Sequence, residues 1–303
     1  MLRGGVRWLL LFVLGLAAGG ILGAASGLRS AGDAAVPVIP KALREGATRF
    51  APPAKAEPRR SLRDVRFAPP LARAGRPRIA VVIDDLGLSH NAFARVNALP
   101  GPLTLAFLPY GPDAQEMLDS VRPGHEVILH LPTEPVSKTE DAGPDMLRPG
   151  DPASIEATLA LNLAKLSGFK GVNNHTGSRF TADTDAMSTL LAALNRRGLY
   201  FLDSVTTGHP VAHRLAQGKG YRVIERDVFL DSNYDAGATG VKAQLAALED
   251  IAIRDGQAVA IGHPYAATLE ALGPWLVTAQ ARGFELVTAG DLAGERIVSA
   301  SLR

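Results

Sequence analysis

The strongest constraint on the fold is a series of short apolar runs that starts after Arg78 and shows no alternation of apolar and polar residues. The first run is IAVVI at 79–83, and further runs lie at 103–108, 126–131, 171–173, 199–202, 221–224, 228–230, 258–261 and 285–287. A strand that is apolar on both faces must be covered on both faces. These runs therefore predict a parallel sheet covered by helices.

Helix signals lie between the runs. Asp151-Pro152 predicts a helix start, and Thr181 predicts the cap of a helix that ends at Gly198; a further helix is expected at 266–282. We expect an α/β fold, a distorted parallel (β/α) barrel of about seven strand–helix units in residues 78–303. A closed barrel suits this number of units best, and an open doubly wound sheet is the alternative.

The N-terminal segment carries an uncharged apolar run at 8–28, preceded by Arg3 and Arg7 and followed by Arg29. About 20 apolar residues span a bilayer as a helix, and flanking positive charge keeps the N-terminus in the cytoplasm. Residues 1–29 are therefore predicted to be a transmembrane signal anchor in the inner membrane, with the folded domain in the periplasm. A cleaved signal peptide is the alternative, although its apolar core is usually only about 7–15 residues long.

Residues 30–77, rich in Ala, Pro and Arg, predict a disordered linker. The charged residues are balanced, at 32 Lys+Arg against 30 Asp+Glu, and no basic stripe is interleaved with aromatics. We therefore expect no nucleic-acid partner. Cysteine is absent, so export to an oxidising compartment would need no disulfide.

Ionisable residues follow the predicted strands at the point where each strand ends. The carboxyl ends of parallel strands meet at one rim, so these side chains are expected to share a site. Each of these residues, considered alone, could instead have a structural role: an Asp could cap a helix, and a His could form a hydrogen bond in the core. The residues are Asp84, Asp85, His130, His175, Asp203, Asp231 and His263.

The adjacent pair Asp84-Asp85 is the most informative of these. Two neighbouring carboxylates repel one another unless a proton or a cation lies between them. A divalent metal, with zinc preferred, could be bound by Asp85, His130 and His175, leaving a position for water and leaving Asp84 to act as a base. Glu134 is either a further ligand or partner of this site, or a surface carboxylate.

Two further segments are candidates for the same site. His263 stands in AIGHP, where Gly262 leaves space and Pro264 forces a turn, so it is predicted to protonate a leaving group. A helix-start histidine without chemistry is the alternative. The segment NNHTGS at 173–178 is either a ligand-binding loop or a turn. The predicted substrate-binding residues are Asn174, Thr176, Gly177, Ser178 and Asp203.

Four of these segments, VIDDLG at 82–87, ILHLPTEP at 128–135, GVNNHTGS at 171–178 and LDSVTT at 202–207, together resemble the divergent polysaccharide deacetylase family. That family is remotely related to the NodB-homology carbohydrate esterases, and the resemblance covers about residues 78–290. It implies a distorted (β/α) barrel and a divalent metal, commonly zinc. It also implies that Asp84 is the base, Asp85 a metal ligand and His263 the acid.

The sequence departs from the pattern of the wider superfamily at three places. Asp-Asp-Gly is Asp-Asp-Leu-Gly here, the second motif His-x-x-x-His has Glu134 as its last residue, and an Arg-Pro-Pro-Tyr-like motif is missing. The segment 173–178 stands near the position of that missing motif. His175 is therefore expected to replace the lost histidine as a ligand.

Three functions are compatible with these residues. The first is a metal-dependent hydrolase that removes N-acetyl groups from an envelope polysaccharide. The second is a non-catalytic envelope module that binds a glycan or a protein on a degenerate deacetylase barrel. The third is cleavage of a glycosidic bond by Asp84 and Asp203, which would leave His130 and His175 without a role.

Overall fold

The structure is a computed structural model that describes residues 75–294. The predicted membrane anchor at 1–29 and nearly all of the predicted linker lie outside the described residues, as do residues 295–303. Within 75–294, none of the helices combines the length and the apolar character that a membrane crossing requires.

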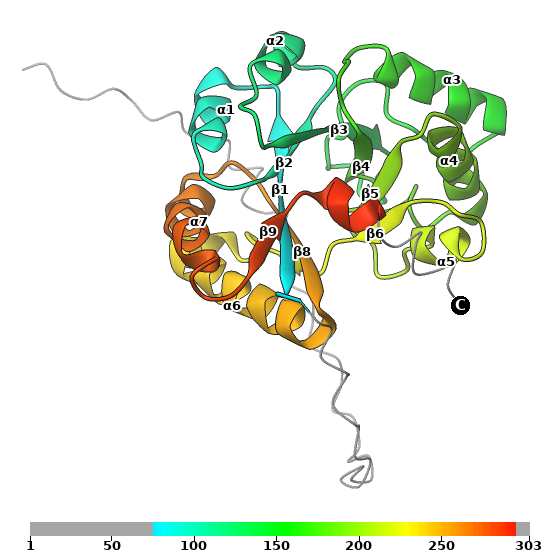
Figure 1. The fold of residues 1–303 in the computed structure, drawn as a ribbon. Helices are drawn as coiled ribbons and strands as arrows, with labels where there is room; N and C mark the ends of the chain where they lie inside the picture. Colours follow the sequence, from blue (N-terminus) through cyan, green and yellow to red (C-terminus); the bar gives the residue numbers. More distant parts are fainter. Residues whose placement is uncertain (1–74, 295–303) are drawn as a thin grey trace, which may run out of the picture. The chain divides into compact units, whose positions relative to one another are not determined.

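The predicted parallel sheet is present (Figure 1). Eight strands follow the order β6-β5-β4-β3-β2-β1-β8-β7, and β9 pairs with the first residues of β1. The strands are β1 (Arg78–Leu86), β2 (Thr104–Phe107), β3 (Glu126–Thr133), β4 (Gly171–Thr176), β5 (Tyr200–Asp203), β6 (Val223–Glu225), β7 (Val228–Phe229), β8 (Gln257–Gly262) and β9 (Glu285–Val287).

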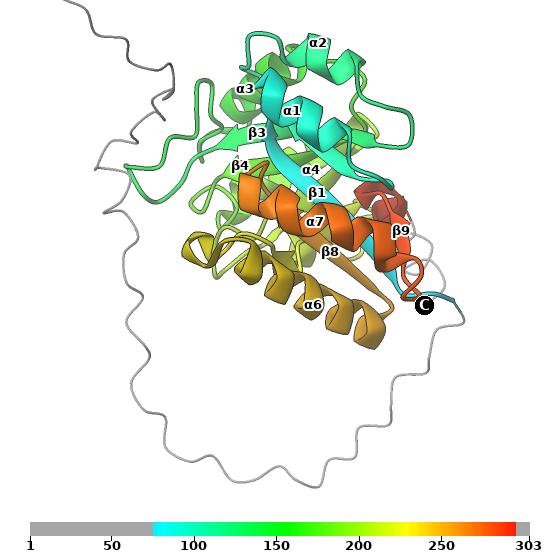
Figure 2. The ribbon, with the colours of Figure 1, turned by 90° about the vertical axis from the view of Figure 1, so that its left-hand side faces the viewer.

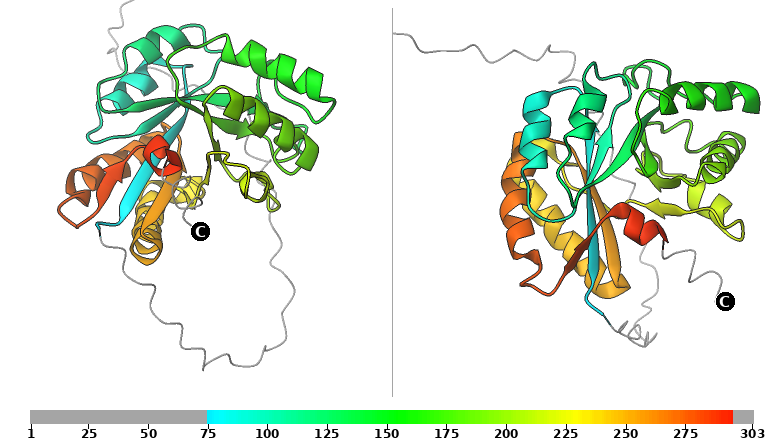
Figure 3. Two further views of the ribbon diagram at one scale, coloured as in Figure 1. Left: turned by 45° about the vertical axis from the view of Figure 1, so that its right-hand side comes forward. Right: turned by 45° about the horizontal axis from the view of Figure 1, so that its top comes forward.

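Helices lie on the outside of the curved sheet, and α6 and α7 pack side by side next to β8 (Figures 2 and 3). The helices are α1 (His90–Asn97), α2 (Ala114–Asp119), α3 (Pro152–Leu163), α4 (Thr184–Arg196), α5 (Ala212–Ala216), the 3-10 helix η2 (Tyr234–Ala236), α6 (Gly237–Asp255) and α7 (Ala266–Ala279).

The start of α3 is as predicted, because the side chain of Asp151 accepts a hydrogen bond from the backbone N–H of Ser154. The predicted cap of α4 is wrong. Asp183 caps this helix by accepting hydrogen bonds from two first-turn N–H groups. A carboxylate also interacts favourably with the positive end of the helix dipole. Thr181 is buried and donates its hydroxyl proton to the carbonyl of Gly177 instead.

Successive residues of each strand face opposite sides of the sheet and build two separate cores. Ile79, Val81 and Ile83 of β1 pack against the helices, whereas Ala80 and Val82 belong to an inner core that contains no residue of α1–α7. The uninterrupted apolar runs are thus explained by burial on both faces. This alternation also decides which polar residues can reach the inside of the barrel.

The predicted closed barrel is not formed, because the hydrogen-bonded path ends at β6 and β7. These strands have only three and two residues, and two residues connect them. Arg226 N–H donates to the carbonyl of Asp203 in β5, and Asp227 N–H donates to the carbonyl of Val259 in β8. The fold is therefore a parallel half-barrel in which a two-residue connection takes the place of a closing ladder.

Candidate metal centre and active site

Asp84 and Asp85 reach the same rim because β1 is irregular at its end. The strand alternation places Asp84 on the inner face, where it is 3% exposed. Asp85 would then face the helices, but its φ of 59° and a register shift between Ile83 and Leu86 redirect it. Asp is one of the few residue types that adopt this left-handed conformation readily. A local backbone irregularity thus presents two adjacent carboxylates to one site.

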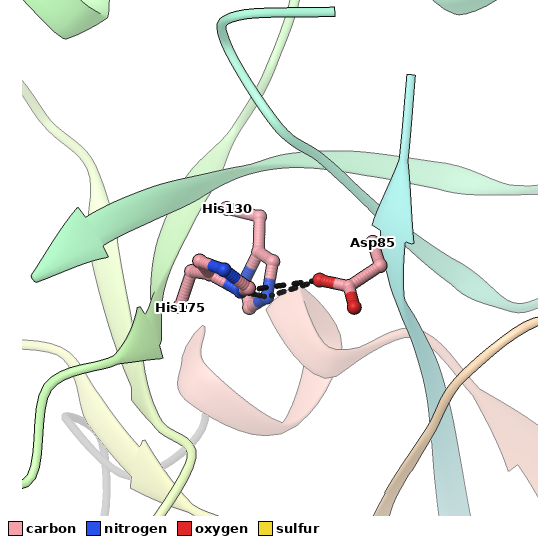
Figure 4. Close-up of side chains that lie close together, drawn as sticks. All are labelled: Asp85, His130 and His175. Atoms are coloured by element: carbon pink, nitrogen blue, oxygen red, sulfur yellow. Dashed lines mark hydrogen bonds and ion pairs between the residues drawn. The ribbon is translucent and has the colours of Figure 1, made fainter. Parts of the chain in front are cut away.

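Two histidines from neighbouring strands meet Asp85 (Figure 4). His130 lies on the inner face of β3, and His175 lies near the end of β4. Asp85 Oδ1 is 3.3 Å from His130 Nε2 and 3.1 Å from His175 Nδ1, and the two nitrogen atoms are 3.1 Å apart. The three residues predicted to bind a metal therefore come together.

The arrangement of these three side chains fits a divalent cation. Asp85 Oδ1 is buried and accepts no hydrogen bond within the described part of the chain. Zinc bonds of about 2.0–2.1 Å in tetrahedral geometry place neighbouring ligand atoms roughly 3.3 Å apart, close to the distances found here. Burial raises the pKa of Asp85, but the two imidazoles outweigh this effect and lower it, so the carboxylate is ionised. Three ligands leave one position open in such a site.

Asn173 fixes the protonation of His130. Its amide nitrogen donates to Asp84 Oδ1 over 2.8 Å and to Ser204 Oγ over 3.3 Å. Its amide oxygen, 2.8 Å from His130 Nδ1, is left to accept the ring proton. His130 Nε2 then presents its lone pair to the centre, as a metal ligand must. The sequence placed Asn173 in a candidate ligand-binding segment but did not predict its contact with His130, with which it pairs directly in the β3–β4 register.

Asp84 is held with one oxygen free for the site. Asn173 occupies Oδ1, whereas Oδ2 lies 3.6 Å from His130 Nε2. Burial raises the pKa of Asp84, and the neighbouring charge of Asp85 adds to the increase; the opposing effects of His130 and His263 are smaller. The charge of a bound cation would favour the ionised form of this carboxylate.

His263 follows β8 and is oriented by Asp231. Asp231 Oδ1 lies 3.1 Å from His263 Nδ1, and Asp231 Oδ2 accepts the backbone N–H of His263 and the hydroxyl of Thr268. His263 Nε2 is 3.7 Å from Asp85 Oδ2. Burial lowers the pKa of His263, but the hydrogen bond to Asp231 and the charge of Asp85 raise it to about 9. His263 is thus protonated at neutral pH. The sequence placed Asp231 at a strand end without assigning it this role.

A pocket surrounds these groups, and two of the predicted substrate-binding residues, Asn174 and Thr176, line it. Gly177 does not; its φ is +96°, and a Cβ there would lie 2.1 Å from Thr133 Oγ1. Ser178 is also used elsewhere, because its hydroxyl accepts the backbone N–H of Val136. The complete lining is Asp84, His130, Asn174, His175, Thr176, Ser204, Val205, Thr206, Arg226, Phe229, Ile261 and His263.

Asp203 lies outside this pocket, contrary to the prediction of a substrate contact. Tyr200 and Leu202 take the inner face of β5, so Asp203 points to the outer face and is completely buried. Its Oδ1 accepts the N–H of Val205, and its Oδ2 accepts no hydrogen bond from a described residue. Burial raises the pKa of Asp203 to about 6. The three residues that follow it line the pocket instead.

Glu134 and Arg226 support loops of the site. Glu134 forms ion pairs with Arg148 and Arg179, at 3.7 and 3.3 Å, and is not one of the three clustered ligands. Arg226, for which sequence reasoning found no signal, donates to the carbonyls of Ser204 and Val205. Its guanidinium thereby holds the segment of the pocket wall in which Val205 has a φ of 51°.

Comparison with known proteins agrees with this fold. The family model described as divergent polysaccharide deacetylase matches residues 81–293. The chain therefore belongs to the divergent polysaccharide deacetylase family.

Two relatives and one solved structure extend the comparison. The chain is 39% identical over 197 residues to the uncharacterized protein YibQ of Escherichia coli K12, covering 64% of this chain and 61% of that protein. It is 34% identical over 198 residues to an uncharacterized protein of Haemophilus influenzae, covering 64% and 69% of the two chains. The crystal structure of uncharacterized protein ATU2773 from Agrobacterium tumefaciens C58 is similar with a TM-score of 0.68 and 31% identity, covering 74% of this chain and 92% of that one.

Proposed function

We propose that this protein is a metal-dependent hydrolase that removes N-acetyl groups from an envelope carbohydrate. The observation that carries the proposal is the convergence of Asp85, His130 and His175 on one point, with a further carboxylate and a further imidazole beside it. Two imidazole nitrogens and a carboxylate oxygen form a ligand set that suits zinc. Membership of a deacetylase family supports the reaction class.

The chain's own residues divide the proton transfers between them. A divalent cation, when bound, polarises the acetyl carbonyl and lowers the pKa of a water molecule. Asp84 accepts the proton of the attacking water through its free Oδ2. His263 donates a proton to the departing amine nitrogen, and Asp231 keeps its ring in the required orientation. Asn173 holds both Asp84 and His130.

The cellular setting belongs to the same proposal. The apolar run at 8–28 and its flanking arginines support an inner-membrane anchor that places the domain in the periplasm. An envelope polysaccharide is then the substrate within reach. Asn174 and Thr176 in the pocket wall supply polar groups for its hydroxyl and acetamido groups.

One observation favours a second function, a non-catalytic glycan- or protein-binding module. Glu134 stands where the second motif of the superfamily has a histidine, and its side chain pairs with arginines instead of joining the ligands. Acetate release separates the two functions, because a binding module would bind carbohydrate without turnover.

The test is the substitution Asp84→Asn in the full chain, assayed for acetate release from N-acetylated chito-oligosaccharides with zinc present. We expect the rate to fall by about 10²- to 10⁴-fold, the usual contribution of a general base. Asp255→Asn is the matched control, because it makes the same change at an exposed carboxylate near the amino end of β8, at the opposite end of the sheet from the site. Equal rates for Asp84→Asn and an active parent would remove Asp84 from the mechanism, and an inactive parent would favour the binding module.

A further inference from the structure

Two tyrosines lie next to the pocket, on the far side of its lining residue His263. Tyr265 lies nearly parallel to the His263 ring, with 5.3 Å between centroids and 24° between planes. Tyr234 meets Tyr265 edge to face, at 5.4 Å and 88°. Phe229, which lines the pocket, meets His263 edge to face, with 5.5 Å between the ring centroids. An unbroken aromatic series thus runs from the pocket wall to the protein surface.

The outer two rings of this series are exposed. Tyr265 is 42% exposed and Tyr234 is 67% exposed. Tyr234 belongs to η2, a single turn with no buried residue, and Tyr265 precedes α7 without making a side-chain cap. Neither phenol hydroxyl forms a hydrogen bond to another described residue. Core packing therefore does not account for the position of the Tyr234 ring.

The two tyrosines also lie at the end of the sheet that carries the pocket. Seven large hydrophobic side chains of the described residues are exposed, and four of them follow strands at their carboxyl ends: Leu88, Val136, Tyr234 and Tyr265. Within this group, Tyr265 contacts both Tyr234 and His263. An exposed apolar surface next to a polar pocket is typical of a ligand-binding subsite.

We propose that Tyr234 and Tyr265 form a subsite that stacks against a sugar ring adjacent to the one whose acetamido group enters the pocket. A pyranose ring has an apolar face of C–H groups and a rim of hydroxyls. A tyrosine has a matching apolar face, and its free hydroxyl can bind at the rim. The inference rests on the proposed function and deepens it, because it assigns the binding position of a second sugar unit of the substrate to two named side chains.

The experiment compares binding of N-acetylglucosamine and its β-1,4-linked tetramer by calorimetry. The full chain carries Asp84→Asn to suppress turnover, and zinc is present. We expect the tetramer to bind more tightly than the monomer. Tyr234→Ala should reduce the ratio of the two affinities about threefold to tenfold, as expected for one lost aromatic contact. Tyr234→Phe keeps the ring and should keep most of the ratio.

Val277→Ala is the control for loss of an exposed apolar side chain, because Val277 lies on α7 and is 70% exposed. It should leave the ratio unchanged. An equal ratio for Tyr234→Ala and its parent, or equal affinity of the parent for monomer and tetramer, overturns the subsite. Binding that depends on Tyr234 without any acetate release by the unsubstituted chain would instead keep the subsite and remove the hydrolase.

Discussion

A carboxylate oxygen is buried at each end of the parallel sheet, but the surroundings of the two oxygens differ. At the amino end, Glu126 Oε2 accepts hydrogen bonds from the hydroxyls of Thr104 and Tyr200, both at 2.9 Å, and from the N–H of Gly290 at 3.0 Å. At the carboxyl end, Asp85 Oδ1 is surrounded by imidazole nitrogens and accepts no hydrogen bond from the described residues.

The difference separates a structural carboxylate from a ligand. A buried carboxylate is costly unless donors or an opposite charge compensate for the lost water. Glu126 has its donors, and the N–H of Gly290 among them attaches the helical segment after β9 to β3. Asp85 Oδ1 faces two imidazole nitrogens that are also within reach of one another, an arrangement in which a cation could be held by all three atoms.

Glu126→Ala should have the largest effect on stability. It removes the shared acceptor of three donors that remain buried and leaves a cavity, so the free energy of unfolding should fall by on the order of 4 kcal/mol. Urea denaturation measures this change. Zinc content should be the same as in the parent, and a variant that lost its zinc without losing stability would contradict the structural role.

Asp203 also has a buried carboxylate oxygen without a hydrogen-bond donor. It therefore tests whether such an oxygen is enough to make a carboxylate a metal ligand. No imidazole forms a contact with it, and burial raises its pKa from 3.8 to about 6. Between these pH values the folded chain keeps a proton that the unfolded chain releases. Asp203 therefore lowers the free energy of unfolding progressively as the pH rises towards 6, and the loss is complete above that pH.

Asp203→Asn removes that titration and keeps the oxygen that accepts the N–H of Val205. The difference in unfolding free energy between Asp203→Asn and the parent should therefore increase in favour of the variant by roughly 2 kcal/mol from pH 4 to pH 7. Thermal or urea unfolding at several pH values gives this difference. A pH-independent difference would show that Asp203 has an ordinary pKa.

Asp85→Ala tests the ligand side of the contrast. Zinc at about 100 times its dissociation constant should stabilise the parent by about 2.7 kcal/mol, because only the folded chain assembles the site. The same zinc concentration should add nearly nothing to Asp85→Ala and the full amount to Asp255→Asn. Removal of zinc by a chelator should reverse the gain. If zinc stabilised the parent and Asp85→Ala equally, the metal would have to bind at another site.

Much of this arrangement could be predicted from the sequence, because strand ends are visible in it. The apolar runs located β1, β3, β4 and β8, and parallel pairing brings their carboxyl ends to one rim. The positions of Asp84, Asp85, His130, His175 and His263 near one another follow from that rule.

The remaining features depend on which face of a strand a residue occupies, and uninterrupted apolar runs hide this information. Asp203 was assigned to the site from its strand-end position, but its place after Leu202 puts it on the outer face. The contact of Asn173 with His130 was not predicted because it comes from the register between β3 and β4. The barrel is open because β6 pairs only with β5 and β7 only with β8, which no local pattern revealed.

Anomalous diffraction at the zinc absorption edge, from crystals of the full chain grown with zinc, tests the metal site directly. We expect one strong peak within bonding distance of Asp85 Oδ1, His130 Nε2 and His175 Nδ1, with Asn173 still bonded to His130. A peak-free site in zinc-containing crystals, or a zinc ion bound by Glu134 or Asp203 instead of these three atoms, would contradict it.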